Sequence, residues 1–341
     1  QAEDGIRDSS TSRGLGDVYK RQDLILHFGA LAILLFLELL GVFSDYHQGN
    51  FARILVLAAY GIGYNVLFGY TGLLSLGHAL FFSAGLYASG LSIYHLDYNV
   101  GQSLILAICF SAFFSLVIGY LALRTVGVSF MIVTLMFSQV GYLCILYFGG
   151  ITRGDEGIVI QQSSRVFLSL DLSDPTIRYY AALIIFSLCL IFNLWIAKSS
   201  FGRVLIAIRE NSDRALMLGY NVHLYKLFAV IISGTISGLA GACYGILFGY
   251  VGASFAAVPY SIFPLLWVLI GGVGTVLGPL VGAIFMFYLI DYASDITDAY
   301  MIIVGITLLV VTLYARRGLL GELRYRSVSY THLTLPTSDL V

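Results

Sequence analysis

The sequence predicts an all-α, polytopic membrane protein with about ten transmembrane helices, some of them short or broken, and with both termini in the cytoplasm. Of its 341 residues, 59% are hydrophobic and only 11% are charged, and the mean hydropathy is +0.89. A soluble chain carries about a quarter charged residues. Apolar runs of roughly twenty residues, the length that crosses a bilayer, follow one another along the chain. Because lipid offers the backbone no hydrogen-bond partner, such continuous runs indicate helices rather than the alternating strands of a barrel.

Both ends of the chain differ in composition from the apolar part between them. Residues 1–22 and 327–341 are polar and aperiodic, and they meet the hydrophobic part abruptly. We expect both to be non-native tails added during sequence assembly, with short native cytoplasmic tails as the alternative. The transmembrane domain is therefore expected to cover residues 23–326.

Ten apolar segments within this domain are candidate membrane spans. The eighth and ninth are short, and the third is interrupted by glycines. In chain order the expected spans are Leu24–Phe43, Phe51–Gly69, Leu73–Tyr94, Gly101–Leu123, Gly127–Phe148, Thr176–Ala197, Leu227–Tyr250, Pro259–Ile270, Val276–Ile290 and Tyr300–Tyr314.

Positive charge is distributed unevenly between the two sides of these spans. Alternation places ten Lys and Arg residues on the side that holds both ends of the domain, and four on the other side. Since cytoplasmic loops carry the excess of Lys and Arg, the larger group is predicted to be cytoplasmic. The larger group is Arg124, Lys198, Arg203, Arg209, Arg214, Lys226, Arg316, Arg317, Arg324 and Arg326, and the smaller is Arg53, Arg153, Arg165 and Arg178.

Glycines recur at the spacing that lets membrane helices approach closely. Small residues matter there because lipid provides no hydrophobic drive between helices. We expect three sets of glycines to pack helices together. They are Gly234 with Gly238, Gly241 with Gly245, and Gly274 with Gly278 and Gly282. The run GGVGTVLG at 271–278 lacks the lysine of a nucleotide-binding phosphate loop, so it predicts no ATP site.

The third span differs from a plain lipid-facing helix. Its beginning mixes glycines with polar side chains, among them Gly72, Ser75, Gly77 and His78. Broken helices expose backbone dipoles, so this stretch is a candidate for a transport pathway. The alternative for His78 is a hydrogen bond to a neighbouring helix. Glu38 is another ionisable residue within a span, and it is solitary.

The segment 198–226 is a polar interruption dense in positive charge. Residues 202–210 form an amphipathic pattern, and Asn211 or Ser212 is a suitable N-cap for a second short helix that Gly219 can close. Two partners suit such a segment. It can lie on lipid headgroups, or it can contact a separate soluble protein. The pattern alone leaves both interpretations open.

Four stretches of this sequence resemble signatures of the branched-chain amino acid permease family of ABC importers, and in particular its M-type subunit. The resemblance covers essentially residues 23–326, with the stretches in the family's order. They are GLLSLGHALFFSAGLYASG at Gly72–Gly90, FGGITRGDEGI at Phe148–Ile158, SSFGRVLIAIRENSDRALMLGYNVHLYKLFAVIISGTISGLAGACYG at Ser199–Gly245 and GGVGTVLGPLVGA at Gly271–Ala283.

The resemblance implies a multi-pass permease of the bacterial inner membrane that imports branched-chain or related amino acids. Its implied partners are a second permease subunit, ATP-binding cassette subunits that bind ATP and magnesium, and an extracytoplasmic solute-binding protein. This chain would hold no cofactor and no catalytic residue. By the same resemblance, the coupling segment at 198–226 includes Arg209, Glu210, Asn211, Ala215 and Gly219. Gly72, Ser75, Gly77 and His78 would lie near the substrate pathway.

Other functions fit the sequence less well. The same family branch includes transporters of urea and short amides. A self-contained secondary transporter would need paired ionisable residues within its spans, and only Glu38 and His78 lie well inside the expected spans. An intramembrane enzyme would need a nucleophile with a base, or a metal site, at a spacing that is absent here. The net charge of −1 gives no reason to expect nucleic acid as a partner.

Overall fold

A computed structural model describes residues 29–35, 45–314 and 318–322 of the chain. The chain divides into two units, residues 1–48 and 49–341, which are treated separately. Residues 29–35 of the first unit are helical. Most of the expected first span, Glu38 within it, and both expected tails lie outside the described residues.

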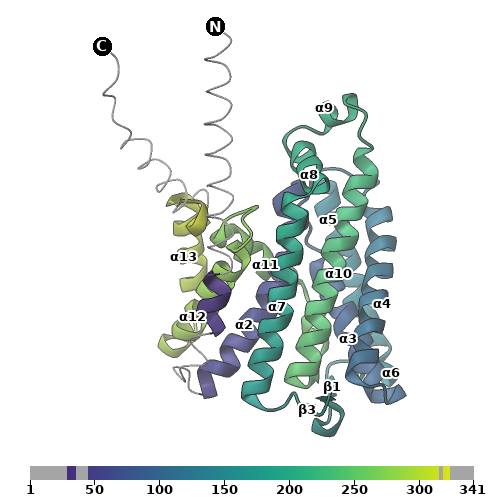
Figure 1. Cartoon of the computed structure of the whole chain (residues 1–341), viewed down its shortest axis with the longest axis vertical. Helices are drawn as coiled ribbons and strands as arrows, with labels where there is room; N and C mark the ends of the chain where they lie inside the picture. The colour runs from purple at the N-terminus through teal and green to yellow at the C-terminus, as the bar shows by residue number, and fades with distance from the viewer. Residues whose placement is uncertain (1–28, 36–44, 315–317, 323–341) are drawn as a thin grey trace, which may run out of the picture. The chain divides into compact units, whose positions relative to one another are not determined.

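Helices make up nearly all of the described part of the second unit, and two pairs of very short strands complete it (Figure 1). The helices are α2 (Asp45–Asn65), α3 (His78–Leu96), α4 (Val100–Ala122), α5 (Val128–Tyr147), α6 (Gly149–Thr152), α7 (Pro175–Lys198), α8 (Ser200–Glu210), α9 (Ser212–Met217), α10 (Val222–Phe248), α11 (Val258–Gly271), α12 (Gly278–Ile296) and α13 (Tyr300–Tyr314). A π-helix, η1 (Val66–Tyr70), continues α2, and two 3-10 turns are η2 (Gln162–Ser164) and η3 (Ala253–Ala256).

Seven of the described helices are long and apolar enough to cross a membrane, and Val258–Gly271 and Tyr300–Val311 are shorter apolar helices. This confirms the prediction of an all-α, polytopic membrane protein. The expected total of ten spans stays a prediction, because the first of them lies largely outside the described residues. Several boundaries were wrong. Helix α2 begins at Asp45 rather than Phe51, and α12 ends at Ile296 rather than Ile290, so the expected ninth span is long enough to cross a membrane. Helix α10 begins at Val222 rather than Leu227, since Asn221 caps it by accepting a hydrogen bond from the Leu224 amide.

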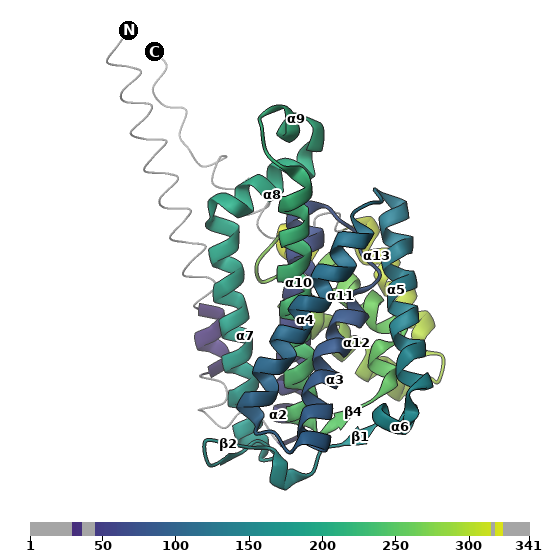
Figure 2. The ribbon, with the colours of Figure 1, turned by 90° about the vertical axis from the view of Figure 1, so that its right-hand side faces the viewer.

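Helix α10 packs along α3 and α4, and glycines bring the backbones together (Figure 2). A Cβ atom added at Gly85 would overlap the Gly238 carbonyl oxygen, and one at Gly241 would overlap the Phe82 carbonyl oxygen. A Cβ at Gly234 would press on Ser115 of α4. The predicted packing role of the α10 glycines is confirmed.

Helices α11 and α12 form a second close pair. A Cβ at Gly282 would overlap the Trp267 carbonyl oxygen, and one at Gly271 would overlap the Gly278 carbonyl oxygen. Gly274 was expected to join this packing set, and that was wrong. It lies in the turn between the two helices with φ +78°, a backbone conformation that favours glycine.

The third expected span begins later than its hydropathy indicated. Residues 72–77 are not helical, and α3 starts only at His78. Gly72 has φ +72°, and Gly77 lies so close to the Thr134 backbone that a side chain would overlap it. The apolar character of residues 73–77 therefore reflects burial of a non-helical segment and not a helix.

The polar segment after α6 folds over one end of the helices. Strand β1 (Ile158–Val159) pairs antiparallel with β4 (Tyr250–Val251), and β2 (Val166–Phe167) pairs with β3 (Leu170–Asp171). Helices α8 and α9 lie at the opposite end (Figures 1 and 2). The two ends of this unit therefore differ in structure as well as in charge.

Candidate functional site

Helices α8 and α9 and their connections, residues 199–221, form the α8–α9 segment. The Ser199 hydroxyl caps α8 by accepting from the Gly202 amide at 3.1 Å, and the Asn211 side chain caps α9 by accepting from the Arg214 amide at 2.9 Å. Gly219 ends α9 with φ +87°. The predicted Asn211 cap and Gly219 terminus are confirmed, because both depend on residues next to the helix ends; the Ser199 cap was not predicted.

The two faces of the α8–α9 segment have different environments. Leu205, Ile208 and Ala215 are buried against the rest of the chain. Three consecutive apolar residues at the end of α9 are exposed instead: 61% of Leu216, 87% of Met217 and 72% of Leu218. None of these three is among the expected coupling residues. Their hydrophobicity is visible in the sequence, but their exposure is known only from the fold.

The five expected coupling residues do not share one surface. Glu210, Asn211 and Gly219 are exposed, whereas Ala215 is 3% exposed. Arg209 is accessible at the surface, but its guanidinium turns inward and donates to the Gly69 carbonyl oxygen. A Cβ at Gly274 would lie 3.4 Å from Arg209 Nη1. Arg209 therefore joins α8 to η1 and to the α11–α12 turn.

Asn65 completes this contact from within the helices. Its side chain is fully buried, donates to the Thr275 carbonyl oxygen at 3.0 Å and accepts from the Gly274 amide at 2.9 Å. We call Arg209, Asn65, Gly69 and Gly274 the α8 junction. It connects α8 to two turns, those that precede α3 and α12. Sequence reasoning missed Asn65, because its partners lie about 210 positions away.

Three of the four expected pathway residues lie along the non-helical stretch before α3, and the fourth, His78, is the first residue of α3. Gly72 is exposed beside Arg209, while Ser75, Gly77 and His78 are buried. The Ser75 carbonyl oxygen accepts from the Tyr64 hydroxyl at 3.0 Å, and the Ala79 amide donates to the Ser261 hydroxyl at 2.9 Å. Backbone groups freed by the broken helix are thus paired with α2 and α11, as membrane burial requires.

His78 contacts two other helices. Its Nε2 lies 2.8 Å from the Ser233 hydroxyl of α10, which donates its one proton to the Gly63 carbonyl oxygen of α2 at 2.6 Å. Since that proton is committed, His78 Nε2 must donate, and Nδ1 carries the lone pair. Nδ1 is buried and has no partner within the described residues. The hydrogen bond to a neighbouring helix, the alternative weighed for His78, is present.

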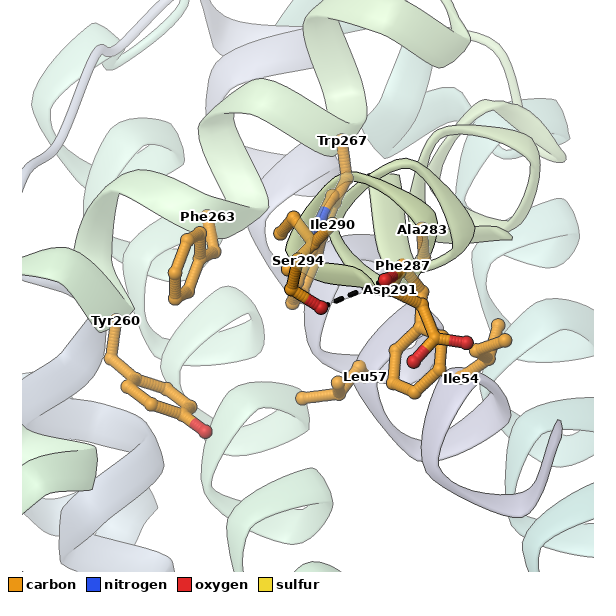
Figure 3. A pocket seen from close by; sticks show the side chains of 10 residues that line it. All are labelled: Ile54, Leu57, Tyr260, Phe263, Trp267, Ala283, Phe287, Ile290, Asp291 and Ser294. Carbon is orange, nitrogen blue, oxygen red and sulfur yellow. Dashed lines mark hydrogen bonds between the residues drawn. The ribbon is translucent and has the colours of Figure 1, made fainter. Parts of the chain in front are cut away.

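A cavity of about 250 Å³ lies between α2, α11 and α12 (Figure 3). Its walls are mostly apolar and aromatic, and Asp291 and Ser294 lie together on α12. The sequence did not reveal it, because its walls come from three helices that are ordinary apolar spans in sequence. The residues that line it are Ile54, Leu57, Tyr260, Phe263, Trp267, Ala283, Phe287, Ile290, Asp291 and Ser294. Among the described residues, no three His, Cys, Asp or Glu side chains are grouped to hold a metal ion.

Comparison with known proteins gives a consistent result. The model of the family described as "Branched-chain amino acid transport system / permease component" matches residues 49–312. The high-affinity branched-chain amino acid transport system permease protein LivM of Escherichia coli (strain K12) is 27% identical over 286 residues, covering 77% of this chain and 67% of that protein.

Two further relatives match over shorter regions. The probable branched-chain amino acid transport permease protein LivM of Methanocaldococcus jannaschii is 28% identical over 141 residues, covering 37% of this chain and 41% of that protein. The probable branched-chain amino acid transport permease protein LivH of the same organism is 28% identical over 143 residues, covering 41% of this chain and 44% of that protein.

The apolar helices and the family match together identify the chain. It is a multi-pass membrane protein, of the inner membrane in bacteria, and it belongs to the family of permease components of the branched-chain amino acid transport system.

Proposed function

We propose that this chain is one membrane-spanning subunit of an ATP-driven importer of branched-chain or related amino acids. Its partners are a second permease subunit, ATP-binding cassette subunits and an extracytoplasmic solute-binding protein. The partner ATPase binds ATP and magnesium, so this chain contributes no catalytic residue. The family match supports the transport role, and the occurrence of LivM and LivH relatives in one organism supports a paired permease.

The observation that carries the coupling role is the exposed end of α9. Leu216, Met217 and Leu218 lie at the tip of the α8–α9 segment, and both views place α9 farther from the membrane helices than α8 (Figures 1 and 2). An amphipathic helix on lipid headgroups would lie at the edge of the hydrocarbon region with its apolar residues facing the lipid. Apolar residues held beyond that edge favour a protein partner, so we assign this end to the cytoplasm.

Movement at this surface can reach the substrate pathway through the α8 junction. Arg209 of α8 donates to Gly69, and Asn65 ties the same region to the α11–α12 turn. A shift of α8 would therefore displace the turns before α3 and α12 together. Only contacts that differ between two states of the importer can drive a switch, so the ATPase must hold α9 differently when ATP is bound.

Reconstitution of the four-component importer into vesicles tests this function. We expect ATP-dependent accumulation of leucine, isoleucine or valine that requires the solute-binding protein, and no accumulation when the ATPase is inactivated by substitution of its own catalytic residue. Accumulation that persists with the inactive ATPase would show a secondary transporter. ATP-dependent uptake of urea or acetamide without amino acids would assign the chain to the amide branch.

A further inference from the structure

Three arginines gather at the C-terminal end of α10, the end opposite α8 and α9. Arg53 of α2 and Arg178 of α7 place their Cζ atoms 5.3 and 5.6 Å from the centre of the Phe248 ring. Arg165, between η2 and β2, donates from Nη1 to the Leu247 carbonyl oxygen at 3.4 Å. Helix α2, helix α7 and the loop before β2 thus bring guanidinium groups to one turn of α10. Below, Arg53, Arg165 and Arg178 are called the arginine cluster.

Within the described residues, these guanidinium groups are satisfied only in part: Arg178 also donates from Nη2 to the Ser173 carbonyl oxygen. The Nε atoms of Arg165 and Arg178 are buried, and neither has an acceptor within the described residues. Cation–π contact with Phe248 and the carbonyl groups at the end of α10 attract the positive charges. Neither contact accepts the two buried N–H groups, and an unmet buried donor carries a full desolvation penalty. The cluster is therefore built for a further acceptor.

The neighbouring carboxylates are occupied elsewhere. Asp171 accepts from Gln162 Nε2 at 2.9 Å and from the Ser173 amide at 2.8 Å, and Asp174 caps α7 by accepting from the Thr176 amide at 2.9 Å. Both attract the arginines at longer range. Burial lowers the pKa of Arg165, and Asp171 opposes that shift.

A chain of aromatic contacts runs from the arginine cluster to the cavity. The Phe248 ring lies 4.7 Å from Tyr244, which lies 5.1 Å from Phe255, and Phe255 lies 4.9 Å from Tyr260. Tyr260 also lines the cavity between α2, α11 and α12 (Figure 3). Aromatic side chains offer large apolar faces to a branched aliphatic group. Charge recognition and an apolar surface are therefore adjacent.

We propose that the arginine cluster binds the α-carboxylate of the substrate amino acid on the extracytoplasmic side, with the substrate's apolar side chain against Phe248 and Tyr244. This proposal rests on the proposed function and deepens it. Planar guanidinium groups pair with carboxylates through two parallel hydrogen bonds, which a neutral amide cannot match. The site therefore selects amino acids over urea and short amides.

Direct binding of radiolabelled leucine to the purified importer, without its solute-binding protein, tests the site. We expect Arg165→Gln and Arg178→Gln to weaken leucine binding by about tenfold each, the loss of one charge-assisted hydrogen bond. Arg178→Lys should give an intermediate loss of leucine affinity, because lysine keeps the positive charge but cannot form two parallel hydrogen bonds with a carboxylate. Leucinamide, which lacks the carboxylate, should compete at least about tenfold less well than leucine in the wild type and equally poorly in the variants.

Arg153→Gln is the matched control, because Arg153 lies over Tyr94 at 5.3 Å, outside the cluster. It should leave leucine affinity unchanged. Unchanged affinity in both cluster variants, or no saturable leucine binding by the wild type, would overturn the proposal. Loss of solute-binding protein from the variants with leucine binding intact would also overturn it, since the cluster would then be a docking surface. Failure of the wild-type importer to accumulate any amino acid with ATP would instead defeat the proposed function.

Discussion

Replacing Asn65 by leucine should destabilise the membrane domain by removing the centre of the α8 junction. Leucine is close to asparagine in size and suits a helix, so the change leaves no large void. It removes the donor to the Thr275 carbonyl oxygen and the acceptor of the Gly274 amide. Because Asn65 is fully buried, water cannot replace either partner.

The size of the effect follows from these two unpaired groups. Each buried backbone group that loses its partner costs about 1–3 kcal/mol, so the substitution should cost about 2–6 kcal/mol. At roughly 2–4 °C per kcal/mol, the scale for domains of about 150–250 residues, the unfolding midpoint should fall by at least about 4 °C. The turn before α12 should also move independently of α2, so ATP-driven uptake should fall more than protein abundance does.

Thermal unfolding of the purified importer, followed by intrinsic fluorescence at one fixed scan rate, measures the shift. Asn50→Leu is the matched control, since Asn50 lies on the same helix and its side chain forms no hydrogen bond with the described residues. Its midpoint should change by less than about 2 °C, the range of a substitution that breaks no such contact. Equal shifts for the two variants would refute the reasoning that the α8 junction is held by Asn65.

Two further predictions concern helix packing and helix capping. Gly85→Ala should lower the unfolding midpoint by several degrees, because its methyl group overlaps the Gly238 carbonyl oxygen. The control Gly305→Ala should leave the midpoint unchanged, since nothing lies within 4 Å of the added atom. Similar midpoints for the two variants would contradict the close packing of α3 on α10. Asn211→Ala removes the cap of α9 and should cost about 1 kcal/mol locally. It should increase amide hydrogen exchange at Arg214, and unchanged exchange there would argue against the cap.

Local signals predicted much of this structure. The Asn211 cap and the Gly219 terminus depend on residues within a few positions of each other, and the apolar runs depend on length alone. The packing role of the α10 glycines could also be predicted from the sequence, because close helix approach needs small residues at fixed spacing. Their partners in α3 and α4 became known only from the fold.

Long-range contacts could not be predicted. Arg209 reaches the Gly69 carbonyl oxygen across 140 positions, and Asn65 reaches the α11–α12 turn across about 210. The arginine cluster was visible in sequence only as positive charge on the side with fewer cations. Which of those arginines come together depends on the packing of α2 and α7 around α10, and no spacing along the chain encodes that.

The most direct test of the coupling role is co-purification of the ATP-binding subunit with a Met217→Asp variant. A carboxylate at a position 87% exposed should not disturb this chain alone, but it would be buried at a docked surface. We predict at least about a tenfold loss of bound ATP-binding subunit, the equivalent of 1.4 kcal/mol. The control variant Leu168→Asp changes an exposed position at the end of the molecule opposite α9, and it should bind the ATP-binding subunit as the wild type does. Full recovery of the ATP-binding subunit with Met217→Asp would contradict the assignment of α9 as its docking surface.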